Sequence, residues 1–244
     1  MIIDSRHNIH PGTNRVLVKI PRGNTTIELC GMKLDIDISF DPGRHVDVYG
    51  EVAAVPDGLH YKKIRNSLFR GSMTHKVQNM ELEVGDKIYF LYFAAIMALG
   101  YMADFTKMPY HEDNAYFICK DEVYILIPYE SIFVAVRGEQ IIPLNGYALV
   151  EPIMFNEYDV DFIKNMREHE NVGIVRYIGN HNLEYNEKRM KDAVDIKPGD
   201  TILFRRFNNQ CLENDLHQSF PHKGHLFKMQ RRFICAKIIN STIK

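Results

Sequence analysis

The turn Val84-Gly85-Asp86, followed by the apolar run Ile88-Tyr89-Phe90, sets the architecture of this 244-residue chain. In a turn of this kind Gly adopts a positive φ and the Asp carboxylate accepts backbone N–H bonds, which reverses the chain ahead of a strand. The same arrangement recurs at Pro198-Gly199-Asp200, ahead of Thr201-Ile202-Leu203-Phe204. Short β-branched and aromatic runs bounded by Gly, Pro, Asp and Asn are typical of strands. We therefore expect an all-β protein, with Ala94 to Met102 as its one helical segment.

Four sequence blocks occur twice along the chain, in the same order. The pairs are Pro11–Lys19 with Pro143–Glu151, Gly50–Pro56 with Gly173–Gly179, Leu82–Phe90 with Ile196–Phe204, and Ile132–Val136 with Phe233–Ile238. Their offsets fall from 132 through 123 and 114 to 101 residues, so each connection is shorter in the second copy. Insertions and deletions collect in surface loops and are rare within strands. The pattern predicts two tandem domains, residues 1–137 and residues 138–244.

Taken in this order, the blocks resemble the chaperonin-10 (GroES-like) co-chaperonin family. Its pattern R-G-E-V-x-A-V-G-x-G is similar to the sequence from Tyr49 to Gly58, and its V-K-V-G-D-x-V-x-F is similar to Leu82–Phe90. Its opening strand P-L-x-D-R-V-L-V-K resembles Pro11–Lys19, and its closing strands resemble Glu122–Val136. The resemblance implies two tandem GroES-like small β-barrels, the first with long mobile-loop and roof-loop insertions and the second divergent. It also implies a chaperone role in protein folding.

In that family a flexible loop after the first strand carries a short apolar segment that docks on a large ring chaperonin. The corresponding region, Pro21 to Val48, contains Cys30-Gly31-Met32-Lys33-Leu34. The resemblance implies a nucleotide-bound ring chaperonin as the partner. It implies a docking segment that comprises Gly31, Met32, Leu34 and Ile36, and a second candidate loop with Val160, Phe162 and Ile163. The alternative is that Ile27 to Ile38 forms one alternating strand whose apolar residues are buried.

The apolar segment after Phe90 is the other candidate contact surface. Its residues Ile96, Met97, Leu99, Tyr101 and Met102 are too apolar to be left in water, so we expect them to be buried. We expect these residues to pack either on their own barrel, which we favour, or against a neighbouring copy. Self-association of the chain therefore stays a possible outcome. The short link Arg137-Gly138-Glu139 favours an interface between the two halves and disfavours a seven-membered ring of whole chains.

Composition and motifs exclude several function classes. The chain has 30 basic and 31 acidic residues and a net charge of -1, which disfavours a binder of phosphate backbones. Its four cysteines form no C-x-x-C pair, so we expect neither a zinc ribbon nor a disulfide scaffold. It lacks G-x-S-x-G, H-E-x-x-H, a P-loop and G-x-G-x-x-G. We therefore expect a protein that is not an enzyme and uses no cofactor.

Two further clusters have simpler explanations than a binding site. His217, His222 and His225 have no recognised zinc spacing, so we interpret them as a solvated loop and expect no metal. Phe204-Arg205-Arg206-Phe207 and Arg231-Arg232-Phe233 mix charge and ring on each strand face, so nucleic-acid binding is disfavoured.

The longest apolar run has 16 residues, Ile88 to Ala103, which is too short to span a bilayer. With no targeting segment visible, we expect a cytoplasmic protein. Two alternatives to a co-chaperonin stay open. The first is a structural or assembly protein that has lost chaperonin docking, and the second is a nucleic-acid-binding barrel.

Overall fold

In the computed structural model the chain forms two compact units, Met1–Ala135 and Val136–Lys244. The division lies two residues from the predicted boundary after Arg137. No helix in the described part of the chain is both long and apolar enough to cross a membrane. The described residues are 9–12, 14–20, 26–29, 32–35, 49–64, 73–99, 116–119, 122–156, 166–180, 195–206, 210–212 and 220–239.

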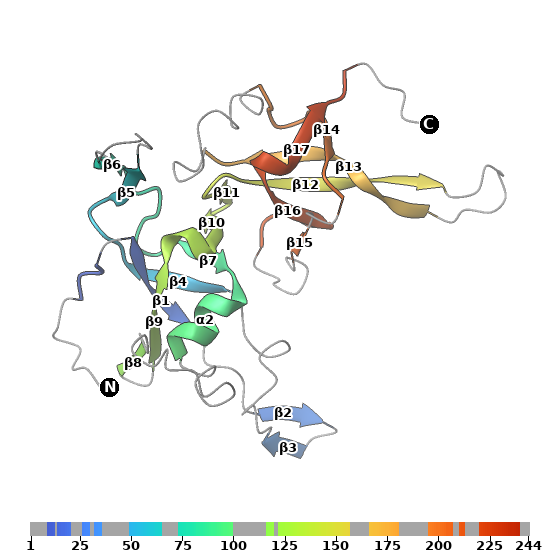
Figure 1. Ribbon diagram of the computed structural model, residues 1–244. Coiled ribbons are helices and arrows are strands. Elements are labelled where there is room, and N and C mark those ends of the chain that lie inside the picture. Colours follow the sequence, from blue (N-terminus) through green and yellow to red (C-terminus); the bar gives the residue numbers. More distant parts are fainter. Residues whose placement is uncertain are drawn as a thin grey trace, which may run out of the picture. The chain divides into compact units, whose positions relative to one another are not determined.

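The first large sheet has seven strands (Figure 1). In sheet order they are β11 (Gln140–Pro143), β10 (Ile132–Arg137), β7 (Lys87–Phe90), β4 (Tyr49–Ala54), β1 (Arg15–Ile20), β9 (Glu122–Pro128) and β8 (Tyr116–Cys119). Two separate two-stranded sheets accompany it, β2 (Thr26–Leu29) with β3 (Met32–Asp35), and β5 (Leu59–Ile64) with β6 (Met73–Gln78). The predicted helix is present as α2 (Tyr92–Leu99), which begins two residues earlier than expected. Residues 100–102 of the prediction lie outside the described ranges.

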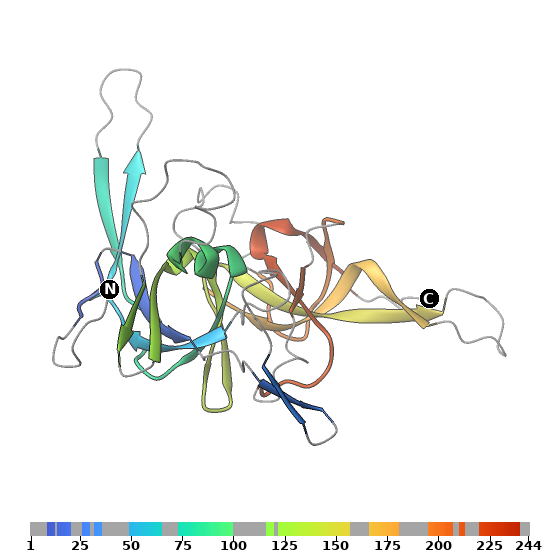
Figure 2. The same ribbon diagram turned by 90° about the horizontal axis from the view of Figure 1, so that it is seen from below.

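The second large sheet has six strands and lies in the second unit. In sheet order they are β15 (Gln210–Leu212), β16 (Leu226–Gln230), β12 (Tyr147–Asn156), β13 (Met166–Ile178), β14 (Thr201–Phe204) and β17 (Ile234–Lys237). Strands β12 and β13 form a long ribbon that extends beyond the other strands of this sheet (Figure 2). Two short 3-10 helices each precede a strand of these sheets, η2 (Tyr129–Ser131) before β10 and η5 (Arg231–Phe233) before β17. The predicted all-β class is confirmed.

The two large sheets have the same strand order once β11 is set aside. The first reads β10-β7-β4-β1-β9-β8, and the second, taken from its other end, reads β17-β14-β13-β12-β16-β15. When the six strands of each set are numbered in chain order within their own sheet, both sets give the order 6-3-2-1-5-4. The sequence blocks that repeat therefore occupy matching strands of the two sheets.

The Gly-Asp turns make matching hydrogen bonds in the two units. Val52 N donates to the Asp86 carbonyl at 2.9 Å and Gly85 N donates to the Val52 carbonyl at 2.8 Å. The equivalent bonds, from Val175 N to Asp200 and from Gly199 N to Val175, measure 2.9 and 2.7 Å. Both turn glycines have a positive φ, 92° and 91°. Each Asp carboxylate also accepts a backbone N–H three residues upstream at 2.8 Å. This is the turn chemistry that the sequence predicted.

Each unit has its own buried core beneath these strands. In the first unit the fully buried residues include Val16, Val18, Val52, Ile88, Ile125, Ile132 and Val134. In the second unit one cluster contains Ala148, Val150, Val175, Ile196, Ile202, Phe204, Phe227 and Met229. Except for Ile125, Phe227 and Met229, these are apolar positions of the repeated blocks, so the pattern that marked the strands also marks most of the core.

The last repeated block was matched one residue out of register. The sequence pairs Ala135 with Ala236, at an offset of 101 residues. The structure pairs η2 with η5 and the start of β10 with the start of β17, at an offset of 102. Backbone bonds agree with the structural offset, because Leu91 N donates to Ser131 and Arg205 N donates to Phe233, each at 2.9 Å. Similarity of residue type does not encode which backbone group is bonded, and one residue of slip exchanges the faces of a strand.

Candidate functional site

The first candidate docking segment lies in the β2–β3 hairpin. Met32 and Leu34 belong to β3, whereas Gly31 and Ile36 lie outside the described residues. The register pairs Met32 with Leu29, and Leu34 with Ile27. The charged pair Glu28–Lys33 stands between these two apolar pairs in the register. Because successive residues of a strand alternate between faces, the backbone assigns the four apolar residues to one face of the ribbon.

The alternative of one continuous strand from Ile27 to Ile38 is wrong. The chain reverses between Leu29 and Met32, and β2 pairs with β3 as a two-stranded sheet separate from the seven-stranded one. An alternating pattern is the same in one long strand and in a hairpin with paired faces, so alternation could not distinguish them. Both strands of this hairpin, β2 and β3, lie in the connection between β1 and β4.

The second candidate loop lies at the end of the β12–β13 ribbon. Val160, Phe162 and Ile163 fall in residues 157–165, outside the described ranges, between the end of β12 and the start of β13. The described end of the ribbon carries exposed apolar side chains, with Met154 exposed by 47% and Met166 by 51%. This connection, between β12 and β13, matches the one between β1 and β4 that contains the first candidate segment.

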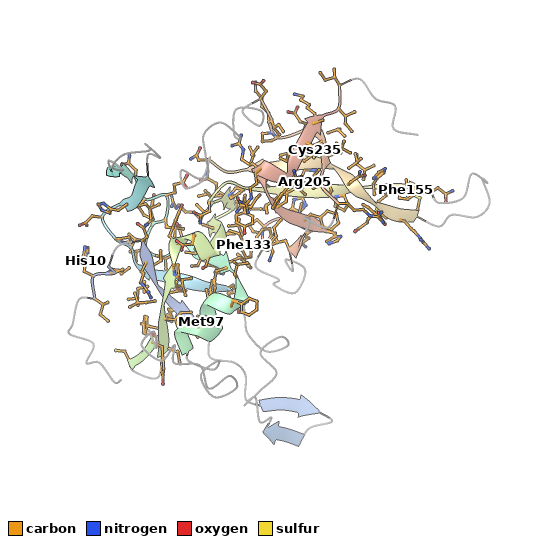
Figure 3. The ribbon with its side chains drawn as sticks, in the orientation of Figure 1. His10, Met97, Phe133, Phe155, Arg205 and Cys235 are labelled. Carbon is orange, nitrogen blue, oxygen red and sulfur yellow. The ribbon has the colours of Figure 1, made fainter. Side chains whose placement is uncertain are left out.

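Contacts within the ribbon, and contacts with the loop before β16, support this ribbon. Glu168 on β13 pairs with His225, whose ring contacts Phe227 with centroids 4.9 Å apart. Phe155 and His169 form a second ring contact, with centroids 5.4 Å apart. The ribbon labelled by Phe155 in Figure 3 is therefore supported by packing as well as by its ladder of backbone bonds.

The expected burial of the α2 segment on its own unit is wrong for Met97, which among the predicted residues is the one whose side chain the structure describes. Ala94, Ala95 and Ala98 are buried, so one face of the helix packs on the unit. Met97, labelled in Figure 3, is 45% exposed, and Phe93, four residues earlier on the same helix face, is 52% exposed. The three alanines form the buried face of the helix, and the larger Met97 lies on the exposed face. Side chains of Ile96 and Leu99, and residues Tyr101 and Met102, lie outside what the structure describes.

The histidine cluster divides between different partners. His222 makes an edge contact with the Tyr177 ring, and its Nδ1 lies 3.3 Å from the Tyr177 hydroxyl. His225 instead pairs with Glu168. Within the described ranges, which leave out His217, no group of three or more His, Cys, Asp or Glu is placed to hold a metal ion.

No protein-family model and no curated protein matches this chain. The candidate docking residues are therefore assigned from the sequence blocks and from the connections in which they lie.

Sequence reasoning missed that the two basic–aromatic segments come together. Arg205 N donates to the carbonyl of Phe233, which sets the end of β14 beside η5. Arg232 places its guanidinium carbon 4.9 Å from the Phe233 ring centroid, while Arg231 is buried and donates from Nη1 to Gly179 at 2.7 Å. Burial lowers the pKa of the Arg231 guanidinium. The sequence could not show that these two segments lie next to each other, because only the pairing of distant strands brings them together.

Proposed function

We propose that the two units are copies of one small GroES-like β-barrel. The support is their shared strand order, the matching Gly-Asp turns, and the close approach of β1 to Gly50 and of β12 to Gly173. A Cβ at Gly50 would lie 2.4 Å from Val18 Cγ1, and one at Gly173 would lie 2.5 Å from Val150 Cγ1. Glycine at both positions permits an approach of strands that any other residue would prevent.

We propose that the protein acts as a co-chaperonin, docking on a large ring chaperonin through apolar segments of its two units. The observation that carries the proposal is that both candidate segments occupy the same connection of the matched sheets. One lies between β1 and β4, and the other lies between β12 and β13. The chain supplies no nucleotide chemistry in this proposal, because the chaperonin partner performs it.

Apolar burial at the partner provides the binding energy in this proposal. Fully burying a side chain such as Met or Leu contributes about 1.5–3 kcal/mol. The loss of translational and side-chain freedom on docking opposes this gain, so each contact is weak and two contacts in one chain act together. The register pairs Leu29 with Met32 and Ile27 with Leu34, so four apolar residues belong to one hairpin.

The experiment is co-elution of the full chain with a ring chaperonin in the presence of nucleotide. The double variant Met32→Ser with Leu34→Ser is expected to lose association by at least tenfold. A matched control, Glu28→Ser with Lys33→Ser, changes the charged pair of the same hairpin and is expected to retain binding. Circular dichroism and thermal unfolding of each variant report whether the fold is intact.

Three results contradict the proposal. If the Met32 and Leu34 variant binds as the wild type does, these residues are not the docking segment. If the same variant unfolds, the two residues belong to the core. If the wild-type chain itself fails to associate with the chaperonin, the alternative of a structural or assembly protein is favoured.

A further inference from the structure

The second unit has a basic corner, defined by Arg205, Arg206, Arg232 and Phe233. The bond from Arg205 N to the Phe233 carbonyl, 2.9 Å long, holds the two parts of this corner together. Arg205 and Arg232 are exposed, and the Arg206 side chain is 57% exposed. Arg205, labelled in Figure 3, directly follows β14, which pairs with β17. The three arginines thus belong to two backbone segments that one hydrogen bond holds next to each other.

The fold does not require these charges. In the first unit the equivalent bond joins Leu91 N to the Ser131 carbonyl at the same length, 2.9 Å. There the positions that match Arg205 and Arg232 are occupied by Leu91 and Glu130. The same backbone geometry therefore forms with an apolar and an acidic residue. The arginines of the second unit add surface chemistry to a corner that folds without them.

The aromatic rings beside the arginines are occupied. Phe204 is 2% exposed and packs edge-on against Phe227, with centroids 6.4 Å apart. The Phe233 ring is faced by the Arg232 guanidinium at 4.9 Å. Base stacking, the main attraction of single-strand binders, is therefore excluded at the buried Phe204 ring and competes with the Arg232 contact at the Phe233 ring. Carboxylates suit this corner better, because a guanidinium binds a carboxylate through two parallel hydrogen bonds.

One carboxylate contact is already present at the edge of the corner. Arg206 Nη2 lies 2.5 Å from Glu170 Oε2 of β13. We propose that the basic corner binds a short acidic peptide segment of a partner protein, through Arg205 and Arg232 together. Arg206, with its contact to Glu170, fixes the side of the corner that faces β13. The proposal is independent of chaperonin docking, since it concerns a different surface and the opposite chemistry.

The test measures binding of a fluorescein-labelled hexaglutamate peptide to the full chain by fluorescence anisotropy at 50 mM and 300 mM NaCl. We expect saturable binding at the lower salt concentration and at least a fivefold weakening at the higher one, since exposed charges are screened. Replacing Arg205 and Arg232 with Gln is expected to weaken binding at least tenfold. The matched control replaces the exposed Lys87 and Lys223 with Gln, which removes the same charge elsewhere and is expected to change binding less than twofold.

Each other outcome overturns the proposal. Equal losses in the two double variants would mean that net charge, and not the corner, attracts the peptide. Absence of hexaglutamate binding at 50 mM NaCl would remove the proposed ligand class. Tighter binding of a labelled octathymidylate, lost in the Arg205 and Arg232 variant, would make the corner a phosphate-backbone site. Circular dichroism of both variants establishes that they are folded.

Discussion

Replacing Gly50 with Ala tests the closest backbone approach between β1 and β4. A Cβ at this position would lie 2.4 Å from Val18 Cγ1 and 2.8 Å from the Lys19 carbonyl oxygen. Favourable contacts between carbon atoms have separations of about 3.5–4.0 Å, so the new methyl group would overlap Val18 by more than 1 Å. Val18 can turn only within its fully buried surroundings, and the Lys19 carbonyl belongs to the backbone of β1. The strands therefore have to separate.

The expected cost follows from two opposing effects. Overpacking of a buried site costs about 1–3 kcal/mol, and a clash with backbone places this site at the upper end of that range. Replacing Gly with Ala also restricts the unfolded chain, which returns about 0.4–1 kcal/mol. The net loss in the free energy of unfolding is therefore about 2 kcal/mol. Gly173→Ala should cost the same, because its Cβ would lie 2.5 Å from Val150 Cγ1 and 2.8 Å from the Glu151 carbonyl oxygen.

Gly12→Ala is the matched control, since no atom lies within 4 Å of the Cβ position at Gly12. This variant should be unchanged or stabilised by about 0.5 kcal/mol. Urea unfolding followed by circular dichroism measures the total effect. Hydrogen exchange of peptides from each unit, read by mass spectrometry, assigns the loss to the β1–β4 or the β12–β13 region. The reasoning is refuted if Gly50→Ala or Gly173→Ala costs no more than Gly12→Ala.

Three further predictions concern charge and surface. A hydrogen bond from Lys237 and one from the Lys197 N–H lower the pKa of Asp200. The contribution of Asp200 to the free energy of unfolding is thus fully present above the unfolded-state pKa of about 3.9. It is lost as the pH falls through the lower pKa of the folded state. Asp200→Asn should cost about 1 kcal/mol at pH 7 in urea unfolding and progressively less as the pH falls below about 3.9, and a cost that does not change with pH would contradict this. The Glu122 carboxylate accepts a 2.7 Å hydrogen bond from Tyr124 and raises the pKa of Tyr124 to about 12. Glu122→Gln should therefore move this titration toward 10, measured by absorbance at 295 nm; the stability from this bond is present below pH 10 and lost as the pH rises through 12. Finally, Met97→Ser should reduce any self-association seen by sedimentation without lowering the melting temperature, and a large loss of stability would show that Met97 is a packing residue.

The sequence predicted the features that are encoded locally. A Gly-Asp turn needs a positive φ and a nearby carboxylate, and both requirements are visible in three residues, as at Gly85-Asp86. Strand positions were visible because apolar runs bounded by turn residues are short-range signals. The helix after Phe90 was predicted to within two residues at its start.

Features that depend on pairing between distant strands could not be predicted in this way. The one-residue error in the last block arose because Ala135 and Ala236 are alike in type but not in backbone bonding. The β2–β3 hairpin was not predicted, because alternation is the same in a strand and in its folded-back form. For the candidate site, the sequence named Met32 and Leu34, but only the register showed that they lie opposite Leu29 and Ile27.

The comparison of the two units separates what the fold requires from what a surface adds. Gly50 and Gly173 are both glycine because a Cβ at either would meet the backbone of the neighbouring strand. Positions under no such constraint differ. At the same backbone bond the first unit has Leu91 and Glu130 and the second has Arg205 and Arg232, so backbone geometry does not account for the arginines. The two exposed arginines add positive charge to this surface, which the proposed acidic ligand would complement. In our proposal this corner is therefore where the second unit makes a contact that the first does not, and the shared glycines mark where the two units cannot differ.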